Sequence, residues 1–307
     1  MIIKKYLPYL AGVFFSSIFG FSFLFTKEVL DIIQPFHLLA LRFSIAAIIL
    51  LLLYLIGIIK LDFNKKDKAM LIILAVVQPG LYFIFETLGI QMTSSSEAGM
   101  MIALIPVVVS IFAFVFLGEK TNKEQVFFVL LSVFGVVFIV FMRGNIGQDF
   151  RLLGIFYLLL AVLMAGIYNV ISRKLSLSFT PVEITFIMMW SGAVFFNILA
   201  LINHKDTFRS YFSPLFNIQV LIALIYLGLF SSIIAFFLMN YTLSRVEAAQ
   251  AAVFANLTTV VSILAGVFIR GESFYWFQVL GGLLIIVGVW GTNYYGNLKK
   301  RVEELPA

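Results

Sequence analysis

The residues best suited to chemistry lie within an apolar stretch. Gln78, Tyr82 and Glu86 are spaced four apart, so in a helix they share one face. Pro79 and Gly80 follow Gln78, and we expect them to kink that helix. Because a polar face is costly against lipid, it should face the protein interior or a water-filled cavity. There it would hold an amine-bearing or amphiphilic substrate, with Glu86 as counter-charge or proton carrier.

Arg42 is the other charge within an apolar run, and it has two interpretations. An Arg at such depth is costly unless it snorkels or finds a partner. The preferred interpretation is a structural ion pair with Glu86, since the topology below places both in the outer third of adjacent spans. In the alternative, the planar guanidinium binds a substrate carboxylate.

Further candidate substrate contacts are single aromatic or polar side chains in other apolar runs. Hydrogen bonds between helices, or from Ser and Thr back to their own helix, are the competing structural explanations for the polar ones. Two of them, Asn256 and Thr259, are three residues apart and share a helical face. The set comprises Phe21, Tyr168, Asn169, Ser232, Asn256 and Thr259.

Several kinds of chemistry are not supported by the sequence. The chain has no Cys and 2 His, so we expect no disulfide, no metal site and no cofactor. No G-x-x-x-x-G-K-[ST] motif is present, so the chain is not expected to hydrolyse ATP. A membrane-embedded enzyme is a remote alternative, because it would show a cluster of catalytic residues and Glu86 stands almost alone.

The elements that must position these residues follow from composition. Of the 307 residues, 62% are hydrophobic and 12% are charged, and the mean hydropathy is +1.09. A soluble surface cannot be built from so few polar residues. About 20 apolar residues cross a bilayer as a helix. Such runs predict ten transmembrane helices in an all-α integral membrane protein, at about 7–26, 36–59, 69–90, 96–117, 125–142, 152–172, 182–202, 217–240, 247–269 and 274–296.

Lys and Arg predict the orientation of these spans. With a cytoplasmic N-terminus, 14 of them lie in inside segments and 6 in outside segments. Both termini are therefore expected in the cytoplasm, and the formal net charge of +6 needs no nucleic-acid partner. The lipid bilayer is the expected partner, in a bacterial inner (plasma) membrane, and a monomer is compatible with the pattern.

The two halves of the chain resemble each other. At a separation of 146 residues, glycines, basic residues and prolines match: Gly20 with Gly166, Lys27 with Arg173, and Pro35 with Pro181. At 153, Gly118-Glu119 matches Gly271-Glu272, and Gly135 matches Gly288. Since each half has five spans, the second must enter the membrane inverted. The predicted domains are repeats at 1–146 and 147–298, followed by a cytoplasmic tail at 299–307.

These motifs together resemble the ten-span EamA-type transporters of the drug/metabolite transporter superfamily, over about residues 10–295. The resemblance rests on the order and spacing of short motifs: Phe19-Gly20, Pro35 with Arg42, Thr93 to Ala98, Pro106, Leu117-Gly118-Glu119, Gly135, Pro181, Val246 to Ala249, Gly271-Glu272, Gly281-Gly282 and Gly288. Thr259 stands at the position that matches Pro106, so span nine lacks that proline. The resemblance implies a carrier of small metabolites or drugs, often an exporter.

We therefore expect a secondary transporter, and no enzyme, that exports small amphiphilic metabolites such as amino acids. The substrate would lie between the inverted halves and be exposed alternately to each side, and protons are a candidate coupling partner. The alternative is an antiporter of nucleotide-linked sugars or other organic anions, which would require more cationic residues than Arg42 in the cavity. The glycines at 135, 281, 282 and 288 are expected to let the last helices of each half pack closely.

Overall fold

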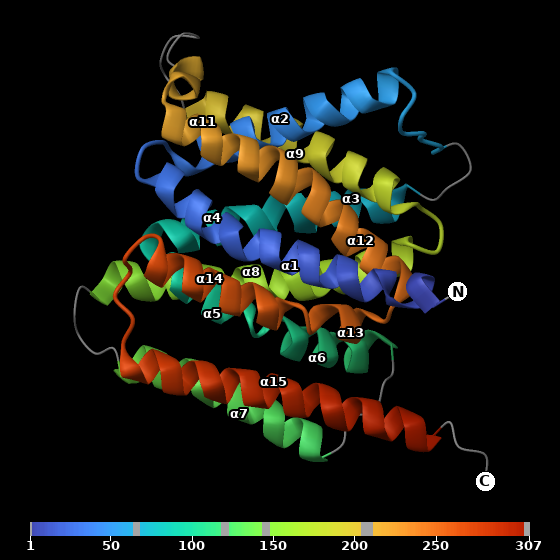
Figure 1. Cartoon of the computed structure of the whole chain (residues 1–307), viewed down its shortest axis with the longest axis vertical. Helices are drawn as coiled ribbons and strands as arrows, with labels where there is room; N and C mark the ends of the chain where they lie inside the picture. The colour runs from blue at the N-terminus through green and yellow to red at the C-terminus, as the bar shows by residue number, and fades with distance from the viewer. Residues whose placement is uncertain (1, 64–67, 118–122, 143–147, 204–210, 304–307) are drawn as a thin grey trace.

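The computed structural model describes residues 2–63, 68–117, 123–142, 148–203 and 211–303, and these residues are almost entirely helical. No strand occurs within these ranges, so the predicted all-α class is confirmed there. Glu119 lies outside the described residues. Figure 1 shows the helices side by side in one bundle, with both chain ends on the same side.

The first half of the chain forms α1 (Ile2–Leu30), α2 (Pro35–Leu55), α3 (Ala69–Ala75), η1 (Val76–Leu81), α4 (Tyr82–Met92), α5 (Ser95–Ile102), α6 (Ile105–Leu117) and α7 (Lys123–Met142). The second half forms α8 (Gln148–Leu175), α9 (Pro181–Asn203), η2 (Ser213–Phe216), α11 (Ile218–Ile225), η3 (Tyr226–Ala235), α12 (Phe236–Arg245), α13 (Ala248–Ala252), α14 (Ala255–Phe268) and α15 (Trp276–Glu303).

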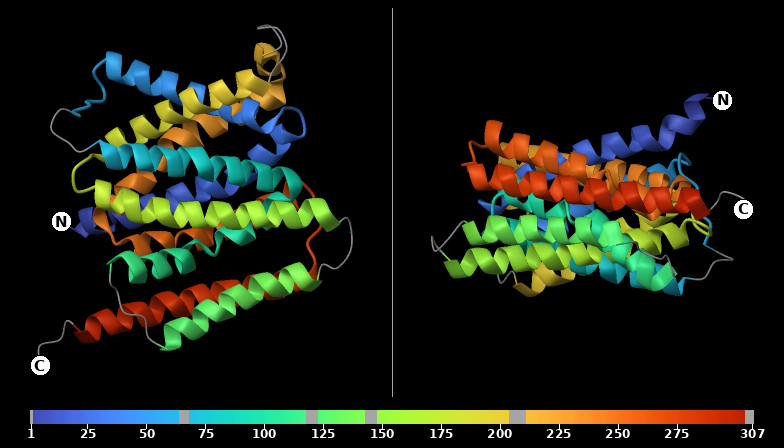
Figure 2. Two further views of the ribbon diagram at one scale, coloured as in Figure 1. Left: turned by 180° about the vertical axis from the view of Figure 1, so that it is seen from behind. Right: turned by 90° about the horizontal axis from the view of Figure 1, so that it is seen from below.

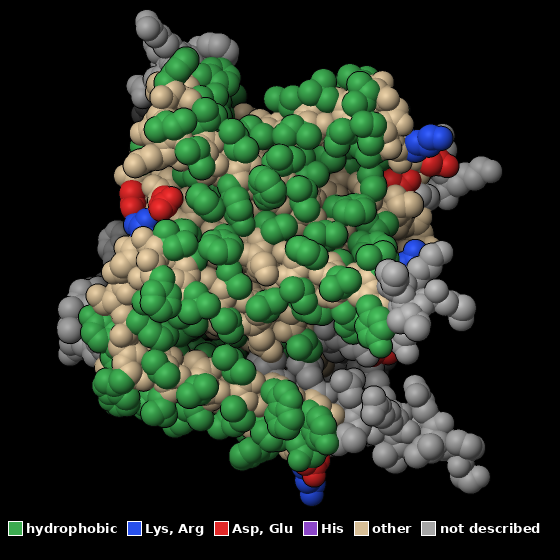
Figure 3. All heavy atoms as spheres, viewed as in Figure 1, with side chains coloured by type: hydrophobic (Ala, Val, Ile, Leu, Met, Phe, Trp, Pro, Cys, Tyr) green, Lys and Arg blue, Asp and Glu red, His purple; other side chains and the backbone are tan. Residues whose placement is uncertain are grey.

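The outer surface of the bundle is apolar. Within the described residues, 7 helical segments are long and apolar enough to cross a membrane, and the shorter apolar helices Ala255–Phe268 and Trp276–Gly288 accompany them. Figure 3 shows hydrophobic side chains over most of the viewed face, with charged groups at its edges. Such a surface is stable against acyl chains and not against water, so the chain is an integral membrane protein.

The third predicted span is bent where the sequence predicts it. Gln78 has non-helical backbone angles (φ −149°, ψ 118°) within the π-helical turn η1, and Pro79 follows it. Proline lacks the N–H that would continue the helical hydrogen bonds, so the ladder breaks here. The predicted kink is therefore confirmed, and it separates α3 from α4.

Two other predicted spans are each divided by a tighter turn, which the sequence did not predict. Leu104 donates to the carbonyl of Met101 between α5 and α6, and Phe254 donates to that of Ala251 between α13 and α14. Pro106 explains the first break because its ring disfavours the preceding helical turn. The second break forms in a segment that contains no proline.

Helices α7 and α15 pack against each other at one edge of the bundle (Figure 2). A Cβ atom added at Gly135 would lie 2.8 Å from the carbonyl oxygen of Gly281, and one at Gly288 would overlap Ser132. The predicted close packing at these glycines is therefore confirmed. It is wrong for Gly282, because nothing lies within 4 Å of a Cβ added there.

Candidate functional site

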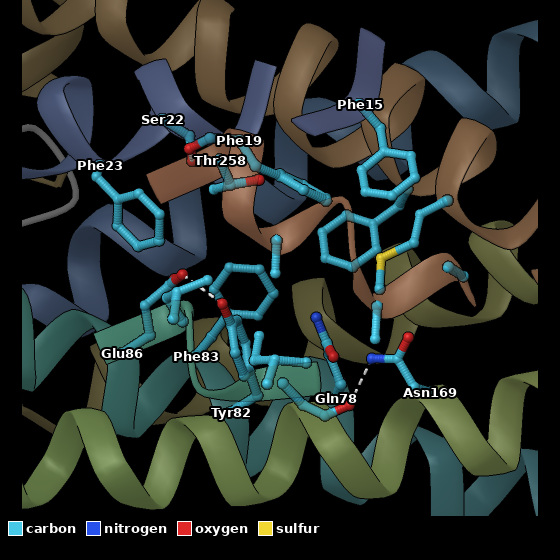
Figure 4. A pocket seen from close by; sticks show the side chains of 18 of the residues that line it. Phe15, Phe19, Ser22, Phe23, Gln78, Tyr82, Phe83, Glu86, Asn169 and Thr258 are labelled. Carbon is cyan, nitrogen blue, oxygen red and sulfur yellow. Dashed lines mark hydrogen bonds between the residues drawn. The ribbon is translucent and has the colours of Figure 1, made fainter. Parts of the chain in front are cut away.

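The candidate site is a cavity at the centre of the bundle, between helices of both halves. Its polar side chains come from α1, α2, η1, α4, α8 and α14: Ser22, Arg42, Gln78, Tyr82, Glu86, Asn169 and Thr258. Its aromatic walls are formed by Phe15, Phe19, Phe23, Phe83 and Phe236. Figure 4 shows Tyr82, Gln78 and Asn169 on one side, with Ser22, Phe19 and Thr258 on the other. Such an apolar lining with a few polar groups is typical of small-molecule sites.

All three residues of the predicted Gln-Tyr-Glu face line this cavity, but only Tyr82 and Glu86 share a helical face, because Gln78 lies at the kink with non-helical backbone angles. Tyr82 donates a hydrogen bond of 2.7 Å to Oε1 of Glu86, one turn further along α4 (Figure 4). Both side chains are buried, and so is Gln78 at the kink. Because the kink ends one helix and begins another, Gln78 faces the same cavity from a different backbone segment.

Two acceptor oxygens in the cavity have no hydrogen-bond partner among the residues that the structure describes. They are Oε1 of Gln78 and Oδ1 of Asn169, and both are buried. The amide nitrogen of Asn169 donates to the carbonyl of Ala165 at 2.7 Å, which leaves its oxygen directed elsewhere. A buried acceptor without a donor is costly. These two oxygens therefore suit a ligand that brings N–H or O–H donors.

Arg42 is held by the second half of the chain. Its Nε donates to Ser232 Oγ at 2.8 Å and its Nη2 donates to Ser231 Oγ at 2.9 Å, both from η3. The guanidinium carbon lies 4.5 Å from the ring centroid of Phe83, within cation–π range. The two serines and the ring thus fix the guanidinium at the wall of the cavity.

The predicted ion pair between Arg42 and Glu86 is wrong as a direct contact. Arg42 hydrogen-bonds serines and Glu86 accepts from Tyr82, and no salt bridge joins the two charges in the described structure. They still attract each other through space. Hydroxyl groups lie within hydrogen-bond distance of each charge: those of Ser231 and Ser232 bind Arg42, and that of Tyr82 binds Glu86. Both charged side chains therefore remain at the cavity wall.

The other predicted residues are divided between the cavity and its surroundings. Asn169 lines the cavity, and Ser232 lies behind it as a partner of Arg42. Tyr168 is fully buried and donates to Oδ1 of Asn240 at 2.6 Å. Thr259 donates to the carbonyl of Gly99 at 2.7 Å, linking α14 to α5. Neither Tyr168 nor Thr259 is a cavity-lining residue.

Two predicted contacts are not among the residues that line the cavity. Phe21 is 38% exposed on the outer surface. Asn256 is absent from the lining, although its Oδ1 is buried and has no partner in the described part of the chain. The sequence reasoning missed Phe15, Phe19 and Phe23, whose spacing of four would have revealed one face of α1. It also chose Thr259 in place of Thr258, which lines the cavity one residue earlier.

Contacts join the two halves of the chain at the end of the bundle opposite the chain termini. Both oxygens of Glu272 accept from Ser95 and Ser96, at 2.8 and 2.6 Å from the amide and hydroxyl of Ser95, and at 2.9 and 2.6 Å from those of Ser96. Burial alone would raise the pKa of Glu272, but these four hydrogen bonds outweigh it and lower the pKa. Gly271 (φ 68°) adopts the left-handed turn that brings Glu272 to α5.

A second contact lies beside this one. Arg270 pairs with Asp31, which joins the loop after α14 to the loop after α1. On α1, Lys27 donates to the carbonyls of Ile90 and Gln91 at 3.0 and 2.9 Å. We call the contacts of Glu272 with Ser95 and Ser96, together with the Asp31–Arg270 pair, the outer clasp.

The space within the cavity is small. About 60 Å³ lies between the lining side chains, which is room for about two water molecules. Sites for drug-sized ligands commonly have about 300–1,000 Å³. A ligand of that size therefore fits only if the surrounding helices move apart.

Comparison with known proteins supplies the family context. The EamA-like transporter family model matches residues 7–141 and 152–294. A relative from Bacillus subtilis (strain 168), "Uncharacterized transporter YcxC", is 39% identical over 96% of this chain and 95% of its own length. A "Probable terminal-alkyne amino-acid exporter" from Streptantibioticus cattleyicolor is 24% identical over 75% of this chain and 74% of its own. A solved crystal structure matches with a TM-score of 0.68 and 18% identity, covering 93% of this chain and 96% of that one.

Proposed function

The chain belongs to the EamA-like transporter family, and from this premise we propose that it is a secondary exporter of small amphiphilic amines, amino acids among them. The observation that carries the proposal is the central cavity, where Glu86 and two unpartnered acceptor oxygens stand among aromatic rings. A cationic amine satisfies such a group of acceptors, and the rings accommodate an apolar side chain.

The cavity chemistry favours a zwitterion over a multiply charged anion. The Glu86 carboxylate and the oxygens of Gln78 and Asn169 would bind an ammonium group. Arg42 would bind a carboxylate, because its planar fork can form two parallel hydrogen bonds to one. The relative that is named an amino-acid exporter supports this class. An organic anion such as a nucleotide-linked sugar would be repelled by Glu86, so the antiporter alternative has less support.

The proposed architecture is ten spans in two inverted five-span repeats, at residues 1–146 and 147–298, with a tail at 299–307. Its support is the family model, which matches the chain twice. Broken helices at similar places in each half, α5–α6 and α13–α14, agree with it. The close pairing of α7 with α15 agrees as well, since these would be the last helices of the two repeats.

Alternating access would operate through the outer clasp. The clasp joins the first half to the second at the end opposite the termini. It would have to open for release of substrate on that side, which we propose is extracytoplasmic in a bacterial inner membrane. A proton on Glu86 would then exchange with the substrate ammonium, coupling export to the proton gradient.

Transport in proteoliposomes with an imposed pH gradient tests this function. We expect the wild type to move an aromatic amino acid in response to the gradient, and Glu86→Gln to lose that response. Glu124→Gln is the matched control, since Glu124 is exposed at the start of α7. Transport by Glu86→Gln that still responds to the gradient as the wild type does would overturn the proton role. Failure to transport any amine or amino acid would overturn the substrate class.

A further inference from the structure

A second concavity lies on the outer surface, away from the central cavity. It is a groove of about 630 Å³ between α3–η1 and α9. Leu71, Ile72 and Val76 form one wall, and Ile187, Ser191 and Phe195 form the other. Lys68 also lines the groove, where the chain enters α3. Figure 2 (left) shows α3 and α9 next to each other on the face opposite Figure 1.

The bend in the third span helps to create this groove. The π-helical turn η1 displaces the chain after Ala75, and Gly80 contributes no side chain to fill the space. On α9, the three wall residues are spaced four apart, so they share one face. The central one, Ser191, is small, and its hydroxyl donates to the carbonyl of Met188 at 3.0 Å. The groove is therefore apolar in character and requires no water.

The groove opens toward the membrane. Ile72 is 65% exposed and Phe195 is 40% exposed, so the walls extend to the surface that faces acyl chains. The end of the groove at Lys68 lies on the side of the chain termini. The orientation predicted from the distribution of Lys and Arg places the cytoplasmic leaflet of the membrane on that side. That leaflet carries anionic lipids, which attract basic groups near the surface.

From this we infer that the groove is a binding site for one anionic phospholipid. An acyl chain lies between Ile72 and Phe195 and over Ser191, and the phosphate pairs with the ammonium group of Lys68. The positive charge of Lys68, the basic residue among those that line the groove, favours a lipid with an anionic headgroup. The lipid also contacts Val76 and Gly80, which flank Gln78 of the central cavity, so it supports the bend that positions Gln78.

Native mass spectrometry of the delipidated full chain in detergent tests the site. Phosphatidylglycerol and phosphatidylcholine with identical acyl chains are titrated separately, and the affinity of the first bound lipid is compared. We expect phosphatidylglycerol to bind about fivefold more tightly, as the attraction of one lysine predicts, and Lys68→Gln to remove that preference. Lys60→Gln is the matched control, since Lys60 is exposed at the other end of the same loop and does not line the groove.

A second pair of variants tests the acyl-chain part of the site. Ser191→Trp fills the groove and should weaken binding of both lipids, whereas Val194→Trp on the exposed surface of α9 should not. Equal affinity of the wild type for the two lipids would overturn the proposal, as would equal losses in the two lysine variants. Unchanged binding by a monodisperse Ser191→Trp protein would also overturn it. If Ser191→Trp does not fold, the lysine pair alone decides.

Discussion

Glu272 and Ser95 stand 177 residues apart in the sequence, and one carboxylate oxygen of Glu272 accepts both the amide hydrogen and the hydroxyl hydrogen of Ser95. The other oxygen binds Ser96 in the same way. The carboxylate thus serves as a cap for the N-terminus of α5, although it belongs to the other half of the chain. A cap from outside the helix makes the helix end sensitive to any movement between the halves.

Glu272→Gln should therefore destabilise the outer clasp. An amide retains one acceptor oxygen and loses the charge, so we expect a loss of about 1–2 kcal/mol in stability. Thermal unfolding of the purified protein measures it. Gln278→Ala is not a suitable control because Gln278 is itself buried. The exposed Glu124→Gln should leave the unfolding temperature unchanged.

The same contact predicts a dependence on pH. Because the pKa of Glu272 is lowered in the folded protein, its contribution is fully present above the pKa of the unfolded chain and is lost as pH falls through the folded value. The difference in unfolding temperature between wild type and Glu272→Gln should therefore be largest near neutral pH and should shrink in acid. A difference that grows in acid would contradict the assignment.

Tyr82→Phe should weaken substrate binding without preventing folding. The change removes the 2.7 Å hydrogen bond to Glu86 and leaves the ring in place. We expect about a two- to tenfold rise in the half-saturating substrate concentration, because the carboxylate is less well oriented. Initial transport rates over a substrate series measure it. Tyr157→Phe, in which the ring stacked on Phe85 is kept, should behave as the wild type.

Arg42→Lys should reduce the transport of an amino acid more than the transport of the matching amine. Lysine keeps the charge but cannot donate to Ser231 and Ser232 and also form two parallel hydrogen bonds to the carboxylate of a substrate. Transport of an aromatic amino acid should fall at least about tenfold. Transport of the matching amine, which has no carboxylate, should fall much less. Equal losses for the two compounds would assign Arg42 a structural role only.

Substitutions at Gly135 and Gly282 should separate the effect of helix packing on stability from the effect of helix propensity. Gly135→Ala places a Cβ atom 2.8 Å from a backbone oxygen of α15, and we expect a loss of about 1–3 kcal/mol in stability. Gly282→Ala meets nothing within 4 Å and should stabilise the helix by a fraction of that, since Ala is the better helix former. Thermal unfolding compares the two. A destabilised Gly282→Ala protein would contradict the packing of α7 against α15.

Part of the site could be predicted from the sequence because helical periodicity is local. The spacing of Tyr82 and Glu86 placed them on one face of α4, and Pro79 predicted the bend beside Gln78, which lines the same cavity from outside that helix. The partner of Arg42 could not be predicted in this way. Ser231 and Ser232 lie about 190 residues away, on a π-helical segment that hydropathy does not reveal.

The amino-acid sequence by itself determined that this chain is a helical membrane protein, since its apolar runs and sparse charges permit no stable soluble surface. It also determined which residues share a face on each helix, through the 3.6-residue period. Only the tertiary structure decided which faces meet. It turned Phe15, Phe19 and Phe23 toward the cavity while Phe21 faces outward, and it gave Arg42 two serines in place of Glu86. The physical reason is that lipid is as apolar as the protein interior, so hydrophobicity does not show which side of a membrane helix faces the protein. The rotation of each helix and the choice of its neighbours depend on packing along its whole length.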